Sequence, residues 1–177
     1  LPDVGYIRAL SPENVLALDP ALIIAEGDAG PPEAVDVLKA AGIPFILVPE
    51  ATDPAGITAK ITAVAGALGL PGEGAALADK VQAGLDATAT RAAAIASPKR
   101  VLFVLSLKGG VMAGGEGTEA EGIIRLAGAV NAATGFQGYK PMTDEAVLAA
   151  KPDAILMMDR EGDLSIADAD VLAQPAL

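Results

Sequence analysis

The sequence contains no cysteine and no histidine, and each absence removes a class of chemistry. Without cysteine the chain can form neither a disulfide nor a thiolate metal site. Without histidine it lacks the commonest metal ligand and the commonest general base. A metal would therefore have to be bound by Tyr, Met, Asp, Glu or backbone oxygen.

Aromatic residues are also scarce, at 3%, and no apolar run approaches the roughly 20 residues needed to span a bilayer. We therefore expect no transmembrane segment, and a core built from Ala, Val, Leu and Ile. The net charge of −11 argues against nucleic acid as a partner, because phosphates would be repelled by this surface.

Strand and helix patterns alternate in the first part of the chain. Short apolar runs at 21–25 and 43–48 predict buried strands. Segments 31–41 and 53–68 predict helices, since each has proline near its start and glycine just past its end. Strands that alternate with helices at these spacings indicate a parallel sheet.

A long alanine-rich stretch without proline follows at 73–96 and predicts one long helix. Such a helix is either an ordinary surface helix or a rigid strut between two lobes. The pattern resumes after it, with expected strands at 100–106 and 154–158 and expected helices at 119–127 and 144–150. We therefore predict an α/β protein with an N-terminal lobe over 1–70, a linking helix over 71–97 and a C-terminal lobe over 98–177.

An internal repeat relates residues 11–23 to residues 143–155 at a constant offset of 132. Each copy has a helix-capping residue (Ser11 or Thr143), a short helix, a proline that ends it and a buried strand. This order is common in α/β proteins and can arise by coincidence. The alternative is that two lobes of like topology face one cleft, where ligands of such sheets usually bind.

The two tyrosines of the chain lie upstream of the two copies. Gly5-Tyr6 matches Gly138-Tyr139 after a slip of one residue, and no other tyrosine is present. This coincidence favours a functional pair on opposite walls of a cleft.

These segments carry a resemblance to a known family. Residues 1–20, the Gly114-Gly-Glu-Gly-Thr118 turn, Ile124–Asn131 and Gly138–Pro141 resemble the periplasmic haemin-binding proteins of bacterial ABC haem importers, over essentially the whole chain. The resemblance implies two Rossmann-like lobes joined by a single long helix, the helical-backbone metal receptor type. Members usually have a further strand and helix before this region and further helices after it, so we expect both ends to be incomplete and the signal peptide to lie outside this sequence.

The function implied by the resemblance is extracytoplasmic binding of haem (hemin) and its delivery to an ABC permease dimer. The location would be the periplasm, or a lipid-anchored position outside the membrane. Haem would be the transported ligand, with no catalytic cofactor and no turnover. Two alternatives are the same fold binding cobalamin, a ferric siderophore or another metal chelate, and a small α/β enzyme, for which no nucleophile–base pair is visible.

The resemblance assigns the axial iron ligand to Tyr6, whose phenolate oxygen suits ferric iron. Arg8 is a candidate cation beside it, because residues two apart in an extended stretch share a face. Some relatives place an arginine of the second lobe near this tyrosine, and Arg160 is the candidate here. The alternative for Arg160 is a solvated loop residue.

The second lobe offers three further candidate contacts. Tyr139 could pack on the porphyrin or bond a propionate, or be a half-buried structural residue. Lys140 could pair with a propionate, or be solvated, and Met112 could touch the porphyrin, or fill the core. Gly114 and Gly115 are interpreted as turn residues that let the backbone approach a flat ligand.

Glu13 and Glu145 occupy the same place in the two copies. The resemblance implies that they dock onto arginines of the permease dimer, since a twofold partner needs two equivalent contacts. A carboxylate in the first helical turn is also favoured by the helix dipole, which is the simpler explanation.

Overall fold

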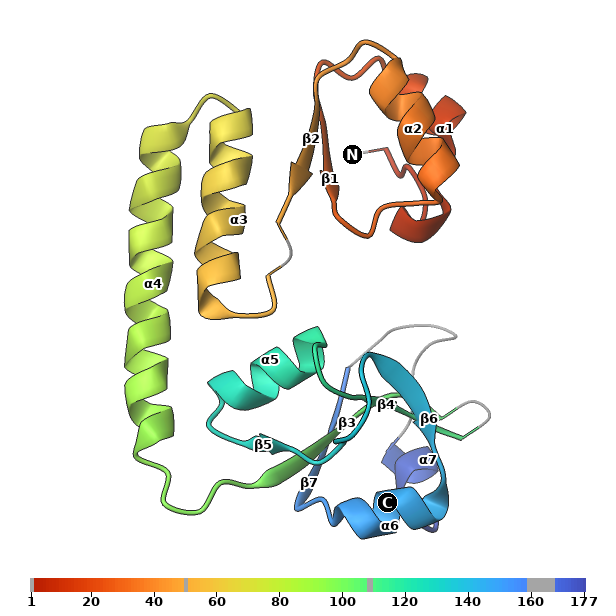
Figure 1. The fold of residues 1–177 in the computed structure, drawn as a ribbon, viewed down its shortest axis with the longest axis vertical. Helices are drawn as coiled ribbons and strands as arrows, with labels where there is room; N and C mark the ends of the chain where they lie inside the picture. Colours follow the sequence, from red (N-terminus) through yellow and green to blue (C-terminus); the bar gives the residue numbers. More distant parts are fainter. Residues whose placement is uncertain (1, 50, 108–109, 159–167) are drawn as a thin grey trace. The chain divides into compact units, whose positions relative to one another are not determined.

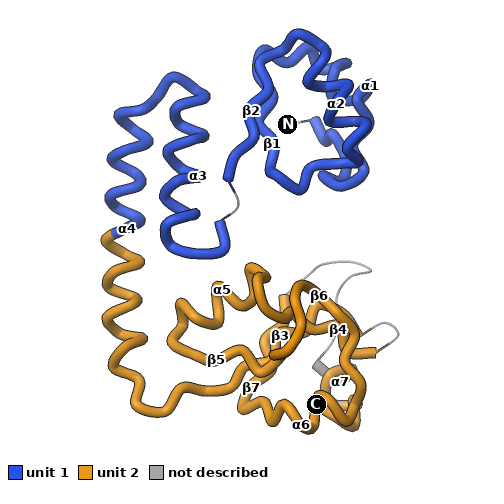
Figure 2. Tube along the Cα trace, viewed as in Figure 1, with its two compact units in different colours: residues 1–82 blue, residues 83–177 orange. Residues whose placement is uncertain are grey.

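The computed structural model describes residues 2–49, 51–107, 110–158 and 168–177 (Figure 1). The chain divides into two compact units, residues 1–82 and residues 83–177 (Figure 2). The division falls inside helix α4 (Pro71–Ala93), so this one helix contributes residues to both units.

Unit 1 is built around two parallel strands, β1 (Ile23–Glu26) and β2 (Phe45–Val48), as the sequence predicts. Its other elements are η1 (Ile7–Ala9), α1 (Pro12–Leu16), α2 (Pro32–Ala40) and α3 (Pro54–Ala67). Helices α1 and α2 pack against each other, and α3 contacts β2 (Figure 1). The buried residues include Val35 and Leu38 of α2 and Val48 of β2.

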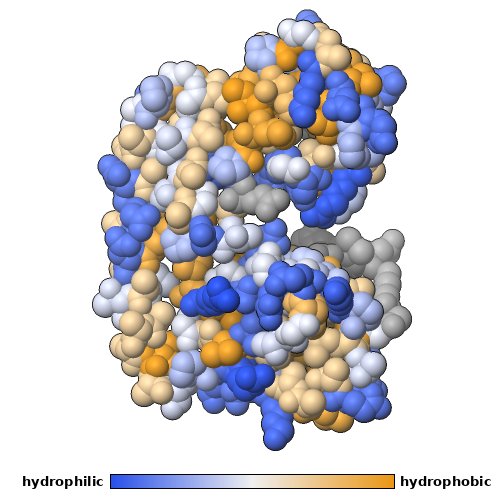
Figure 3. Space-filling model, viewed as in Figure 1, coloured by the Kyte–Doolittle hydropathy of each residue, from blue (hydrophilic) through white to orange (hydrophobic). Residues whose placement is uncertain are grey.

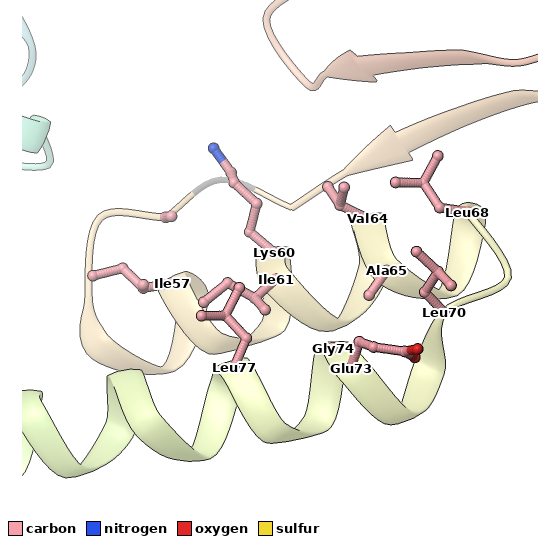
Figure 4. Close-up of a pocket in the computed structure, with 11 residues that line it drawn as sticks. Ile57, Lys60, Ile61, Val64, Ala65, Leu68, Leu70, Glu73, Gly74 and Leu77 are labelled. Atoms are coloured by element: carbon pink, nitrogen blue, oxygen red, sulfur yellow. The ribbon is translucent and has the colours of Figure 1, made fainter.

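The α3–α4 pair of unit 1 packs through a glycine. Gly74 of α4 is buried, and a Cβ atom built on it would lie 2.3 Å from the Cβ of Ala65 on α3. An apolar groove of about 450 Å³ runs along this pair and is lined by α3 residues such as Ile61 and Val64 and by Leu77 of α4 (Figure 4). Hydrophobic side chains also remain at the surface of unit 1 (Figure 3). Leu47 of β2 is one of the large apolar residues that are exposed.

Unit 2 contains a mixed sheet. Strand β3 pairs in parallel with β5 and β7 and antiparallel with β4, and β4 pairs antiparallel with β6. The elements are β3 (Arg100–Ser106), β4 (Val111–Gly114), α5 (Glu119–Leu126), β5 (Val130–Asn131), β6 (Tyr139–Met142), α6 (Asp144–Ala150), β7 (Ala154–Met157) and α7 (Asp168–Leu172).

The two faces of this sheet are buried separately. Leu102 and Val104 of β3 join a core cluster with Val147 of α6. Phe103, between them on the strand, points to the other face and packs with Ile124 of α5. This alternation is the period of two expected of a strand covered on both sides.

The two copies of the sequence repeat begin with the same cap. The Ser11 hydroxyl accepts a hydrogen bond from the Asn14 N–H at 3.3 Å, and the Thr143 hydroxyl accepts one from the Ala146 N–H at 3.2 Å. Each bond satisfies one of the backbone donors that a helix start leaves free.

The copies also end alike. Val15 and Val147, at the same position of α1 and α6, are both buried. Asp19 and Lys151, again matched, have φ values of 48° and 46°, and within the described part of the chain they are the non-glycine residues with positive φ. The offset of 132 therefore relates two backbone conformations as well as two strings of residues.

Candidate ligand-binding site

The arrangement of Tyr6 and Arg8 is set by a short turn at the start of unit 1. Tyr6 precedes the 3₁₀ turn η1 with extended φ and ψ of −76° and 131°, and 61% of it is exposed. Arg8 Nη1 donates a hydrogen bond of 2.8 Å to the Tyr6 hydroxyl oxygen, and the guanidinium carbon lies 6.0 Å from the ring centroid. We expected an extended stretch here. The turn brings the two side chains together instead.

Arg8 is charged, as arginine is throughout proteins, and its surroundings favour the charged form further. The hydrogen bond with Tyr6 raises the pKa of Arg8 above its usual value, and the hydrogen bond and charge of Asp28 raise it further. A phenolate accepts hydrogen bonds only, so a permanently charged guanidinium is a suitable partner for the ionised form of Tyr6.

Asp28 is the part of this site that sequence reasoning missed. It lies in the loop between β1 and α2, twenty residues along the chain from Arg8, and its Oδ2 pairs with Arg8 Nη2. Two backbone hydrogen bonds of 2.9 Å hold the loops together, from Gly30 N to Ile7 O and from Leu10 N to Gly30 O. No local sequence pattern predicts this pairing, because it depends on how the two loops pack in the folded chain.

Tyr139 is in a different electrostatic environment. It begins β6 in unit 2, is 39% exposed, and its hydroxyl donates to Glu119 Oε2 at 3.3 Å. Its ring meets Phe103 edge-on, with centroids 6.2 Å apart. Burial raises the pKa of Tyr139, and the charge and hydrogen bond of Glu119 raise it further. Tyr139 is therefore held as a neutral phenol, whereas Tyr6 accepts a bond from a cation.

The pairing of β6 with β4 fixes the direction of the neighbouring candidates. Tyr139 pairs with Gly114, Lys140 with Ala113, and Pro141 with Met112. Because successive strand residues point to opposite faces, Met112 shares the face of Tyr139 and Lys140 lies on the other face. Tyr139 and Lys140 thus cannot contact a ligand through the same face of the sheet.

Gly114 and Gly115 make room for aromatic side chains of the chain itself. A Cβ on Gly114 would lie 3.2 Å from the Tyr139 ring and 3.3 Å from Phe103. A Cβ on Gly115 would lie 2.5 Å from both the ring and the carbonyl oxygen of Phe136. Both glycines are therefore required by packing inside the protein, and the interpretation that they also let the backbone approach a flat ligand stays a prediction.

Glu13 and Glu145 occupy equivalent exposed positions in the first turns of α1 and α6. A hydrogen bond from its own backbone N–H lowers the pKa of Glu13, and the Ser11 hydroxyl lowers it further; the backbone of Glu145 and the Thr143 hydroxyl do the same for Glu145. Both carboxylates are therefore ionised at neutral pH.

The remaining candidate, Arg160, lies outside the described residues. Within the described ranges, no cluster of three or more Asp and Glu side chains could hold a bare metal ion. Over the same residues, no helix is both long and apolar enough to cross a membrane.

Comparisons with known proteins place the chain in a family. The periplasmic binding protein family matches residues 1–177, and the chain belongs to that family. A comparison with the curated proteins gave no significant match.

Solved structures give a closer likeness. The chain is 42% identical to the periplasmic heme-binding protein BhuT in complex with two hemes, with a TM-score of 0.92, covering 99% of this chain and 68% of that one. It is 38% identical to the periplasmic heme-binding protein RhuT from Roseiflexus sp. RS-1, with a TM-score of 0.83, covering 90% and 62%. A periplasmic heme-binding protein from Pseudomonas aeruginosa is 31% identical, with a TM-score of 0.85, covering 99% and 64%.

The chain therefore spans about two thirds of the length of these relatives. The resemblance to periplasmic haem-binding proteins and the α/β fold class, both predicted from the sequence, are confirmed.

Proposed function

We propose that this chain belongs to a binding protein that captures haem outside the cytoplasm and delivers it to an ABC permease. The observation that carries the proposal is the exposed Tyr6 hydroxyl, which accepts a hydrogen bond from the fixed cation of Arg8. The three relatives support it, since their descriptions name haem binding and the periplasm.

The chemistry of Tyr6 suits ferric haem. Ferric iron is a hard Lewis acid, and a phenolate is an established axial ligand of haem iron. Tyr6 is exposed, so its oxygen is accessible, and Arg8 provides a donor that matches the negative charge of the phenolate. Binding of this kind needs no turnover, and we propose no enzymatic activity.

The second unit would then supply contacts other than the iron bond. The neutral phenol of Tyr139 is suited to hydrogen bonding or to packing on the porphyrin, with Met112 on the same sheet face. Lys140 is proposed as a cation for a propionate, approaching from the opposite face of β6. Arg160 is proposed as the second-unit arginine that serves the ligand tyrosine, the role that the resemblance implies for it. We also propose that Glu13 and Glu145 dock onto a twofold permease, because they are ionised, exposed and equivalently placed.

The test is a titration with hemin followed by absorption spectroscopy. The wild-type chain is expected to give a Soret band together with a phenolate-to-iron charge-transfer band. Tyr6→Phe is expected to abolish the charge-transfer band, because it removes the iron-binding oxygen. Tyr139→Phe is the matched control and is expected to retain it.

Two results would count against the proposal. Retention of the charge-transfer band in Tyr6→Phe would remove Tyr6 from the iron. An unchanged hemin spectrum with the wild-type chain, combined with binding of cobalamin or a ferric siderophore, would favour the same fold with another metal chelate.

A further inference from the structure

The contact between Arg8 and Asp28 lies where two loops of unit 1 are joined. In the first loop, Ile7 and Leu10 lie on either side of Arg8 in the sequence, and both bond to the backbone of Gly30. Gly30 lies two residues after Asp28 in the second loop. Both side chains therefore project from backbone that is fixed close by. The fold thus places the backbones of the two residues within reach of each other.

We propose that Asp28 is a positioning residue, which holds the guanidinium of Arg8 in the orientation that serves the Tyr6 oxygen. The inference rests on the proposed role of Tyr6 in haem binding. Asp28 is bonded to Arg8, and Arg8 in turn is bonded to Tyr6, so Asp28 acts on the phenol oxygen through the guanidinium.

The geometry of the guanidinium supports this role. Arg8 is attached to Tyr6 through Nη1 and to Asp28 through Nη2, so two different nitrogens of one planar group are held at once. An arginine side chain has many rotamers and loses much conformational freedom when it is fixed. A single bond to Tyr6 would leave the plane free to rotate, whereas a second anchor fixes it.

The carboxylate also changes what Arg8 can do for a ligand. Asp28 balances the charge of Arg8, and both terminal nitrogens are engaged within the protein. Two of the donors of Arg8 are thereby used on the tyrosine and the carboxylate, and its charge is balanced, so a haem propionate would gain less from Arg8 than from an unpaired cation. This separates the role of Arg8 from that of the other basic candidates.

The unit contains a matched control for the loss of a carboxylate. Glu26 lies two residues before Asp28 and forms its own exposed ion pair, at 2.7 Å, with Lys60 rather than with Arg8. Asp28→Asn and Glu26→Gln therefore make the same change in charge in the same segment. They differ in whether the lost carboxylate holds Arg8.

The first measurement is hemin affinity and dissociation rate. Asp28→Asn is expected to weaken binding about two- to fivefold, the range for a partly exposed ion pair, while Glu26→Gln leaves it unchanged. Asp28→Glu is expected to recover part of the loss. In the Arg8→Ala background, Asp28→Asn is expected to have no further effect, because a residue that acts through Arg8 has nothing left to position.

The second measurement needs no haem. In the unliganded chain labelled with ¹⁵N, the side-chain N–H signal of Arg8 is expected to show a restrained guanidinium. In Asp28→Asn the relaxation of this signal is expected to show an Arg8 side chain that moves on the nanosecond timescale, whereas in Glu26→Gln the side chain is expected to stay restrained.

Three results would overturn the inference: equal hemin affinity of Asp28→Asn and wild type, an undiminished effect of Asp28→Asn in the Arg8→Ala background, or an Arg8 side chain as rigid in Asp28→Asn as in wild type. Failure of the wild-type chain to bind hemin would instead contradict the proposed function. The ¹⁵N measurement on the Arg8 side chain of the unliganded protein would still decide whether Asp28 orients Arg8.

Discussion

Replacing Gly74 by alanine tests the closeness of helices α3 and α4. The new Cβ would lie 2.3 Å from the Cβ of Ala65, about 1.2 Å inside the ordinary carbon–carbon contact of roughly 3.5 Å. Neither atom can rotate away, since each is attached directly to its backbone. One helix must therefore shift, and overpacking of this kind costs about 1–3 kcal/mol.

The same substitution has a favourable part. Alanine is a better helix former than glycine by about 1 kcal/mol in a helix interior. With the upper part of the overpacking range, Gly74→Ala is expected to destabilise the helix pair by about 1–2 kcal/mol. A Cβ on Gly84, also in α4, would meet no atom of the described residues within 4 Å, so Gly84→Ala is expected to stabilise its surroundings by up to about 1 kcal/mol.

The assay is urea unfolding followed by far-UV circular dichroism, with hydrogen exchange of the α3 and α4 amides to localise the effect. Gly66→Ala provides a control within unit 1, because Gly66 is exposed and its surroundings leave room for a methyl group. Adding Ala65→Gly to Gly74→Ala removes the opposing methyl group and is expected to restore much of the stability. If Gly74→Ala proves as stable as Gly84→Ala, the helices do not pack this closely and the reasoning is refuted.

Two further predictions concern unit 2 and the docking residues. Glu119→Gln in a Tyr6→Phe chain is expected to lower the pKa of Tyr139, read from the ultraviolet absorbance of the one remaining tyrosine; no change would show that Glu119 does not act on it. The pKa of Tyr139 is raised in the folded state, so the unfolded chain loses the phenol proton first, above about pH 10. The stability that Tyr139 contributes is therefore present at neutral pH and is expected to fall as the pH rises above about 10. Glu13→Gln and Glu145→Gln are each expected to weaken binding to the permease about two- to fivefold. The control is Glu33→Gln, in the first turn of α2, and an equal loss of binding in this variant would contradict the docking role.

The framework of unit 1 was predictable because its element ends are marked in the sequence. Pro32 and Pro54 begin α2 and α3, and Gly42 and Gly69, with φ of 77° and 74°, follow their ends. Each mark has a local steric cause, so no tertiary information is needed to use it.

Strands β4, β5 and β6 of unit 2 were missed for the opposite reason. They contain four, two and four residues, and β4 is bounded by Gly110 and Gly114. None of them lies in an apolar run as long as those that mark the equally short strands β1 and β2, and β6 contains a proline. Their strand conformation comes from pairing with neighbouring strands, which the local sequence does not encode.

In the candidate site too, the contacts between sequence neighbours could be predicted and the contacts between distant residues could not. The closeness of Tyr6 and Arg8 was predicted, but from an extended stretch, whereas in the structure the turn η1 that follows Tyr6 brings the two side chains together. Asp28 and Glu119 were not predicted, since each lies twenty residues from its partner. Glu119 bonds to Tyr139 directly, whereas Asp28 bonds to the arginine beside Tyr6, so the different surroundings of the two tyrosines are a product of tertiary structure.

Helix α4 belongs to both compact units, and this has a consequence for how the chain unfolds. A helix forms cooperatively, because each added residue gains a backbone bond only if its neighbours are already helical. Turns of α4 that fray in one unit thus remove hydrogen-bond partners from turns in the other. The two units share one cooperative segment, and melting of either one should be felt by the other through the backbone of this helix.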